Sequence, residues 1–116
     1  MFTSGSWKKS SSGEESDVIN PATGEVIASV PKANLDDVNA CIQSSREAFQ
    51  SKEWASMDPA QRGRILQKMA NATYANAKML AEIESTNNGK TFREALSEIR
   101  YGAWTLEYFA GLSDKI

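Results

Sequence analysis

The chain has 116 residues, of which 41% are hydrophobic and 24% charged, with a net charge of −2 and a pI near 5.2. A chain of this length can build one hydrophobic core of modest size, so we expect one domain or a piece of one. The small negative charge gives no support for nucleic acid or an anionic membrane surface as a partner, which leaves small molecules and proteins.

Cysteine and histidine content limits the possible chemistry further. Cys41 is the single cysteine and the chain has no histidine, which excludes an internal disulfide framework and a zinc site built from these side chains. Residues 1–12 lack the apolar region of a secretory signal, and no stretch approaches the roughly 18 apolar residues of a membrane span. We therefore expect a cytoplasmic protein that has no membrane partner.

A turn signal lies among short strand-forming clusters in residues 1–33. Pro21 fixes its φ at about −65° and favours an extended Asn20, while Gly24 supplies a positive φ. The strand that ends at Ile19 is therefore predicted to pair with a strand over Val26–Val30. Together with short strands at Phe2–Thr3 and Ser6–Trp7 and a polar loop at Ser10–Ser16, these residues form a predicted antiparallel β arm.

From residue 34 onward the apolar period changes from that of a strand to that of a helix. Asn34 is a suitable N-cap, and Asp36 and Asp37 are acidic residues of the first turn. We predict a helix over residues 34–50, with one apolar face formed by Leu35, Val38, Ile42 and Phe49.

A second helix start lies at Asp58, which is followed by Pro59 at the first helical position and by Gln61. The next stop signal is Asn88–Gly89, so one long helix over residues 59–87 is predicted. Its core face is expected to contain Leu66, Met69, Thr73, Ala77 and Leu80.

A third helix, predicted over residues 92–112, is apolar on two sides. One side carries Leu96, Ile99, Ala103, Leu106 and Ala110, and the roughly opposite side carries Tyr101, Trp104, Tyr108 and Leu112. A helix of this kind has to be covered on both sides. The aromatic side packs on the β arm, forms a dimer contact or faces a part of the protein outside these residues; the pattern leaves all three open.

Four segments that cover nearly the whole chain resemble the aldehyde dehydrogenase superfamily in order and spacing. They are Asn20–Val30, Gln61–Leu66, Glu84–Lys90 and Thr105–Leu112. Within them, Asn87–Lys90 and Leu106–Leu112 are most similar to the branch that oxidises betaine aldehyde and 4-trimethylaminobutyraldehyde. The resemblance implies an α/β fold in which residues 1–116 are the N-terminal part of a Rossmann-type cofactor domain, with the β arm and the three helices flanking the rest.

The resemblance also implies a reaction, the NAD(P)-dependent oxidation of an aldehyde to a carboxylic acid. In that family a cysteine thiolate attacks the carbonyl, hydride leaves to the nicotinamide, and a glutamate activates water. These groups correspond to positions downstream of this segment. We therefore expect an N-terminal fragment that has no catalytic residue, binds no NAD or NADP by itself and is inactive alone.

Two candidate sites follow from the resemblance. Glu98 and Tyr101 fall where relatives that act on cationic aminoaldehydes carry acidic or tunnel-lining residues; the alternatives are a solvated acid and a packing tyrosine. The backbone near Val18 and Ile19, together with Asn87, corresponds to a structural monovalent-cation position. Asn87 stands where an aspartate is common, which weakens that site.

Cys41 lies beside Ile42 on the first predicted helix and matches no nucleophile motif of the family. The chain also has no histidine that could activate it. We expect an inert, partly buried thiol.

Two functions remain open at this point. The first is a segment of an aldehyde dehydrogenase whose partners are the rest of the polypeptide, an aldehyde substrate and further copies in a homo-oligomer. The alternative is a truncated, non-catalytic module that binds other proteins or itself through the exposed aromatic side, because large exposed apolar patches mark interaction sites.

Overall fold

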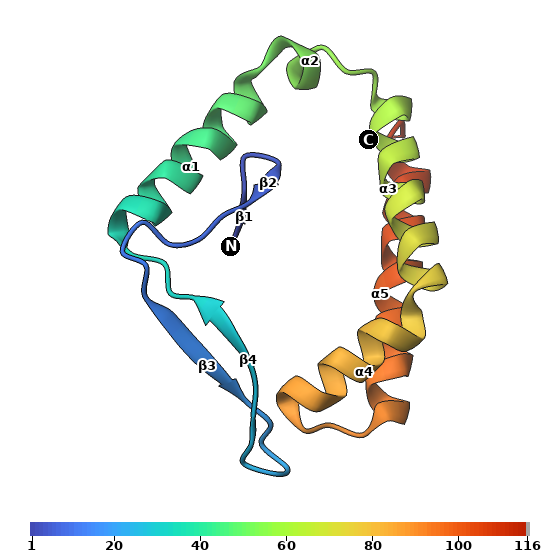
Figure 1. The fold of residues 1–116 in the computed structure, drawn as a ribbon. Helices are drawn as coiled ribbons and strands as arrows, with labels where there is room; N and C mark the ends of the chain where they lie inside the picture. The colour runs from blue at the N-terminus through green and yellow to red at the C-terminus, as the bar shows by residue number, and fades with distance from the viewer. Residues whose placement is uncertain (116) are drawn as a thin grey trace. The chain divides into compact units, whose positions relative to one another are not determined.

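The computed structural model describes residues 1–115 and divides into two compact units. The first unit consists of Met1–Ile19 and Gly24–Ser56, and the second of Asn20–Thr23 and the chain from Met57 onward. The strands lie in the first unit and the three long C-terminal helices in the second (Figure 1). Within residues 1–115, no helix combines the length and the apolar character that crossing a membrane requires.

The first unit begins with two antiparallel strand pairs. Gly24 has a φ of 76°, and the Ala22 N–H donates to Asn20 Oδ1 at 2.9 Å, which confirms the predicted hairpin turn. Ile19 lies opposite Val26, next to an irregularity in the register. The pairs are β1 (Phe2–Thr3) with β2 (Ser6–Trp7) and β3 (Glu15–Ile19) with β4 (Val26–Pro31).

Helix α1 (Leu35–Gln50) begins where the sequence predicts. Asn34 Oδ1 accepts from the Asp37 N–H at 2.9 Å, and the Asp37 carboxylate accepts in return from the Asn34 N–H at 3.1 Å. The apolar face of α1 is exposed: Leu35 and Phe49 are 73% and 72% accessible, and α1 has no buried residue. A one-turn helix that the sequence analysis did not predict, α2 (Lys52–Ala55), follows and is capped by Ser51.

Asp37 also ties the polar loop before β3 to the first turn of α1. Its carboxylate accepts from Ser10 Oγ at 2.7 Å and from the Ser11 N–H at 3.0 Å. Ser10 is 7% exposed and is the buried polar residue of the described chain. The Ser10 hydroxyl, followed by the Asn34 N–H, holds the pKa of Asp37 at about 2, below its ordinary 3.8.

The predicted long helix over residues 59–87 is wrong in one respect, because it is two helices that meet at Asn76. Asn76 has φ −107° and ψ 13°, and its side-chain Nδ2 donates to the Ala72 carbonyl at 2.8 Å. Asparagine competes in this way for backbone acceptors and disfavours helix interiors. The two helices are α3 (Pro59–Ala75) and α4 (Ala77–Asn88), and α5 (Phe92–Leu112) follows them as predicted.

The buried apolar residues of the second unit are all small. They are Ala70, Ala77, Ala81, Ala95 and Ala103, and α5 runs beside α3 and α4 (Figure 1). A Cβ added to Gly63 would lie 2.7 Å from the Ala110 carbonyl oxygen, so α3 and α5 approach through this glycine. The predicted core position Met69 is wrong, since that side chain is 50% exposed.

We expect Gly63→Ala to lower the free energy of unfolding by about 1–3 kcal/mol, because the new methyl group overlaps a backbone oxygen that cannot rotate away. Gly102→Ala is the matched control: it lies in the same helix pair with nothing within 4 Å of the added Cβ. In Gly102→Ala the free energy of unfolding should stay unchanged or rise by up to about 1 kcal/mol, because alanine has the higher helix propensity. Urea titration of both variants measures the difference, and equal stability of the two would contradict the close approach.

Asp37 should make the first unit sensitive to acid. Since its pKa is lowered from 3.8 to about 2 in the folded chain, the unfolded chain binds more protons between these values. The contribution of the Asp37 carboxylate to the free energy of unfolding is therefore fully present above about pH 4 and is lost as the pH falls toward 2. Unfolding midpoints measured across this window should depend less on pH in Asp37→Asn than in the parent, whereas Asp36→Asn, one residue away, should keep the parent's dependence.

Candidate functional site

A row of aromatic side chains lies along one side of α5. Tyr101 stacks on Trp104 with ring centroids 5.5 Å apart, and Trp104 stacks on Tyr108 at 5.9 Å. Phe109 then meets Tyr108 edge to face at 5.4 Å. We call these four residues the aromatic row. All four are at least half exposed, so α5 has one side packed on α3 and α4 and an aromatic side open within the described residues.

An ion-pair cluster adjoins the start of the same helix. Gly89 ends α4 in the left-handed conformation, and Ser85 Oγ donates to the Lys90 carbonyl at 2.7 Å. This turn directs the Lys90 ammonium group to Glu84 Oε1 at 3.1 Å and to Glu98 Oε2, to which it donates a short hydrogen bond. Lys90, Glu84 and Glu98 thus form a cluster with a net charge of −1.

The cluster changes the electrostatics of its lysine. The hydrogen bond to Glu98, followed by that to Glu84, raises the pKa of Lys90 above its ordinary value of 10.5. Lys90 is therefore a permanent cation at neutral pH. The Lys90 side chain is 27% exposed and that of Glu98 is 61% exposed, so the pair is half in solvent.

Glu98 and Tyr101 lie three residues apart on α5 and so share one side of the helix. The structure therefore places the two candidate tunnel residues, Glu98 and Tyr101, next to each other at one end of the aromatic row. Glu98 is mostly exposed and is also bonded to Lys90, so its carboxylate is both solvated and paired. Their contact with a substrate stays a prediction. The sequence analysis missed Lys90 as a site residue, although Lys90 directly follows the Asn88–Gly89 stop signal and lies just before α5.

The candidate cation site also stays a prediction. Val18 and Ile19 belong to β3 of the first unit, and Asn87 to the last turn of α4 in the second. Across residues 1–115, no group of three or more Cys, Asp or Glu side chains is arranged as a metal-binding cluster. That finding concerns side chains and leaves a site built on backbone oxygens untested.

Cys41 is exposed, so the expectation of a partly buried thiol is wrong. It lies on α1, whose whole length has no buried residue. Together with Phe2, Val38 and Ile42 it lines an apolar pocket of about 240 Å³ in the first unit.

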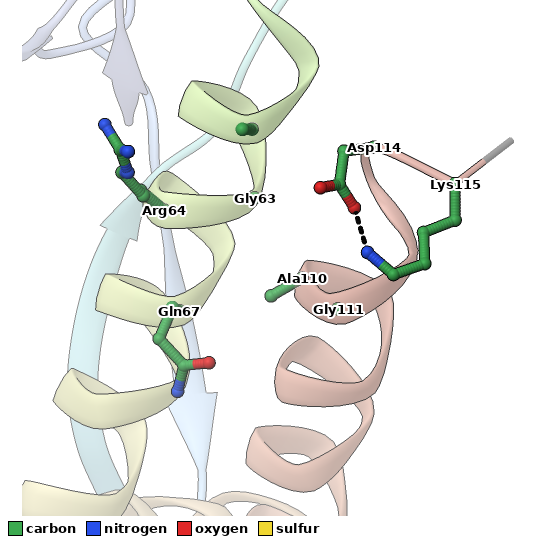
Figure 2. A pocket seen from close by; sticks show the side chains of 8 residues that line it. Gly63, Arg64, Gln67, Ala110, Gly111, Asp114 and Lys115 are labelled. Carbon is green, nitrogen blue, oxygen red and sulfur yellow. Dashed lines mark hydrogen bonds and ion pairs between the residues drawn. The ribbon is translucent and has the colours of Figure 1, made fainter.

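A second pocket, of about 340 Å³, lies between α3 and the end of α5 (Figure 2). Gly63 and Gly111 are among its lining residues. Lys115 is paired with Asp114, and Arg64 points away from that pair in Figure 2. The charged groups around this pocket therefore do not converge on one point where an anionic ligand could be held.

Comparison with known proteins identifies the family. The sequence profile of the aldehyde dehydrogenase family matches residues 7–116, which is most of the chain. The chain belongs to the aldehyde dehydrogenase family.

Individual relatives agree with this assignment. The chain is 43% identical to (Z)-2-((N-methylformamido)methylene)-5-hydroxybutyrolactone dehydrogenase of Acinetobacter baylyi over 86% of its own length and 20% of that protein. It is 40% identical to aldehyde dehydrogenase 1A1 of Rattus norvegicus, with 100% and 24% covered. The chain thus spans a fifth to a quarter of the length of these curated relatives.

Solved structures confirm the fold class. Betaine aldehyde dehydrogenase from Staphylococcus aureus in complex with NAD+ superposes with a TM-score of 0.96 at 31% identity, covering 99% of this chain and 23% of that one. An aldehyde dehydrogenase mutant from Bacillus cereus gives 0.96 at 33% identity, covering 100% and 24%. The chain has the fold of the corresponding part of these enzymes, as the resemblance implied.

We expect Lys90→Met to destabilise the second unit, because it leaves the Glu84 and Glu98 carboxylates facing each other without their shared cation. Added salt should reduce the difference in thermal stability between Lys90→Met and the parent, since salt screens the repulsion of partly exposed charges. Lys78→Met, at an exposed position on α4, is the control and should change thermal stability little. If the loss of thermal stability in Lys90→Met is the same at low and high salt, it comes from lost packing of the lysine side chain and not from charge repulsion.

Proposed function

We propose that this chain forms the N-terminal part of an NAD(P)-dependent aldehyde dehydrogenase, which oxidises an aldehyde to a carboxylic acid. The observation that carries the proposal is the family match over residues 7–116. The likeness to a structure that holds NAD+ supports NAD as the cofactor of the whole protein. We expect the whole protein to be a cytoplasmic homo-oligomer.

The chemical step is assigned to other segments. When bound, the nicotinamide accepts the hydride that leaves the substrate carbon. In the pocket between α3 and α5, Lys115 is paired with Asp114 and Arg64 points away from that pair, so these two cations offer no joint contact to a pyrophosphate (Figure 2). The chain alone is therefore expected to bind no cofactor and to be inactive.

The contribution of this chain is one wall of the substrate tunnel, formed by Glu98 and by the aromatic row, which includes Tyr101. Aromatic faces attract cations, and the Glu84–Lys90–Glu98 cluster adds one negative charge beside them. A wall of this kind favours aldehydes that carry a cationic group. The likeness to betaine aldehyde dehydrogenases is consistent with that substrate class.

The second candidate is a non-catalytic module that binds a protein partner through the aromatic row. Four adjacent aromatic side chains, each at least half exposed, are the observation that favours it. In the first proposal the same row is covered by the remainder of the polypeptide, so the two differ in whether the row is open in the natural protein.

The two candidates are separated by activity. We expect the natural open reading frame that includes this chain to encode a protein that reduces NAD+ or NADP+ in the presence of an aldehyde, measured by absorbance of the reduced nicotinamide. The 116-residue chain should give no signal. If the protein encoded by the natural open reading frame shows no aldehyde-dependent reduction of NAD+ or NADP+, or if that frame ends at residue 116, the non-catalytic protein-binding module becomes the better description.

The role of the wall is tested in the active protein by Glu98→Gln. It should lower kcat/KM for a cationic aldehyde by at most about fivefold, since a partly solvated charge pair contributes about 1 kcal/mol or less. It should leave kcat/KM for an uncharged aldehyde of similar size unchanged. Ser97→Ala, the adjacent exposed position, is the control. Equal losses of kcat/KM for the cationic and the uncharged aldehyde would show that Glu98 does not select the substrate. They would not contradict the proposal of a dehydrogenase.

A further inference from the structure

The loop that joins β2 to β3 presents serines ahead of two carboxylates. Ser11 and Ser12 are exposed, whereas Ser10 is buried at 7% accessibility. Glu14 and Glu15 follow at the second and third positions after Ser12. Glu14 pairs with Lys32 at 3.5 Å with both side chains 65% exposed, so this contact is open to exchange with another cation.

Ser12 is connected to Asp37 by a chain of two hydrogen bonds. Ser10 Oγ gives its single hydrogen to Asp37 Oδ2 at 2.7 Å. In the 3.0 Å contact between Ser10 Oγ and Ser12 Oγ, the donor is therefore Ser12. The Ser12 hydroxyl supports the bond that holds the loop on α1.

We propose that Ser12 is a phosphorylation site for a serine kinase that selects acidic residues after its target. Charge patterns of this kind are a usual basis of kinase specificity. In the step, Ser12 Oγ forms a bond to the terminal phosphorus of ATP, the bond from that phosphorus to the bridging oxygen breaks, and ADP leaves. The hydroxyl proton passes to a carboxylate base of the kinase. The inference is independent of the proposed dehydrogenase function.

Phosphorylation would loosen the loop through two effects. It removes the hydrogen that Ser12 donates to Ser10 Oγ. It also adds a charge of about −1.5 to −2 two hydrogen bonds away from the Asp37 carboxylate, which repels it. The N–H groups of Ser11 and Asn34, which both donate to Asp37, then lose part of their protection from solvent.

The site is tested by incubating the full protein with casein kinase 2 and ATP and locating phosphate by fragment mass spectrometry. We expect phosphate on Ser12, none in Ser12→Ala and a several-fold lower rate in Glu15→Gln. Absence of phosphate on Ser12, or its appearance on Ser11 instead, overturns the proposal.

The structural effect is tested by hydrogen exchange. Amides of Ser11 and Asn34 should exchange several-fold faster in Ser12→Glu than in Ser12→Ala, and this difference should shrink when both changes are made in Asp37→Asn. Ser45→Glu, at an exposed serine of α1, controls for added charge and should leave these amides unchanged. If Ser12→Glu and Ser12→Ala exchange alike, or if the difference persists without the Asp37 charge, the coupling to Asp37 is refuted.

Discussion

Close approach of helix backbones is the constraint on which the second unit depends. At Gly63 the carbonyl of Ala110 occupies the space that a side chain would need, and the buried apolar positions are alanines. Helices that pack this closely have no room for large side chains between them. The aromatic row lies on another side of α5, where its four side chains are at least half exposed, while Leu96, Ile99 and Leu106 on the packed side are only partly buried.

The first unit is held together in a different way. Its buried polar residue is Ser10, and α1 buries none of its apolar side chains among the described residues. Cohesion between the loop and α1 comes from the Asp37 carboxylate, which accepts from Ser10, Ser11 and Asn34. Hydrogen bonds to a charged acceptor are stronger than neutral ones but depend on that charge. We therefore expect the contact between the loop and α1 to respond to protonation and added charge, and the contact between α3 and α5 at Gly63 to respond to added volume.

Local signals in the sequence were sufficient for the hairpin turn and for the starts of α1, α3 and α5, but not for those of α2 and α4. The Pro21–Gly24 turn and the Asn34 cap depend on neighbouring residues alone, and both are confirmed. The break at Asn76 was not predicted, because one asparagine in an apolar pattern does not reveal whether its side chain will bond to the backbone. Exposure of Met69 was missed for a related reason: a helical pattern identifies a face but not how much of it a neighbour covers.

The candidate site shows the same limit at longer range. Resemblance located Glu98, but its lysine partner comes from eight residues earlier, in the turn between α4 and α5 that begins with Gly89 in a left-handed conformation. No helical periodicity links these positions. The pairing matters for the proposed role, because Lys90 is shared by two carboxylates and neutralises only one of them. A cationic group near Glu98 would thus meet one unbalanced charge held in place by an ion pair, with the face of Tyr101 one helical turn away.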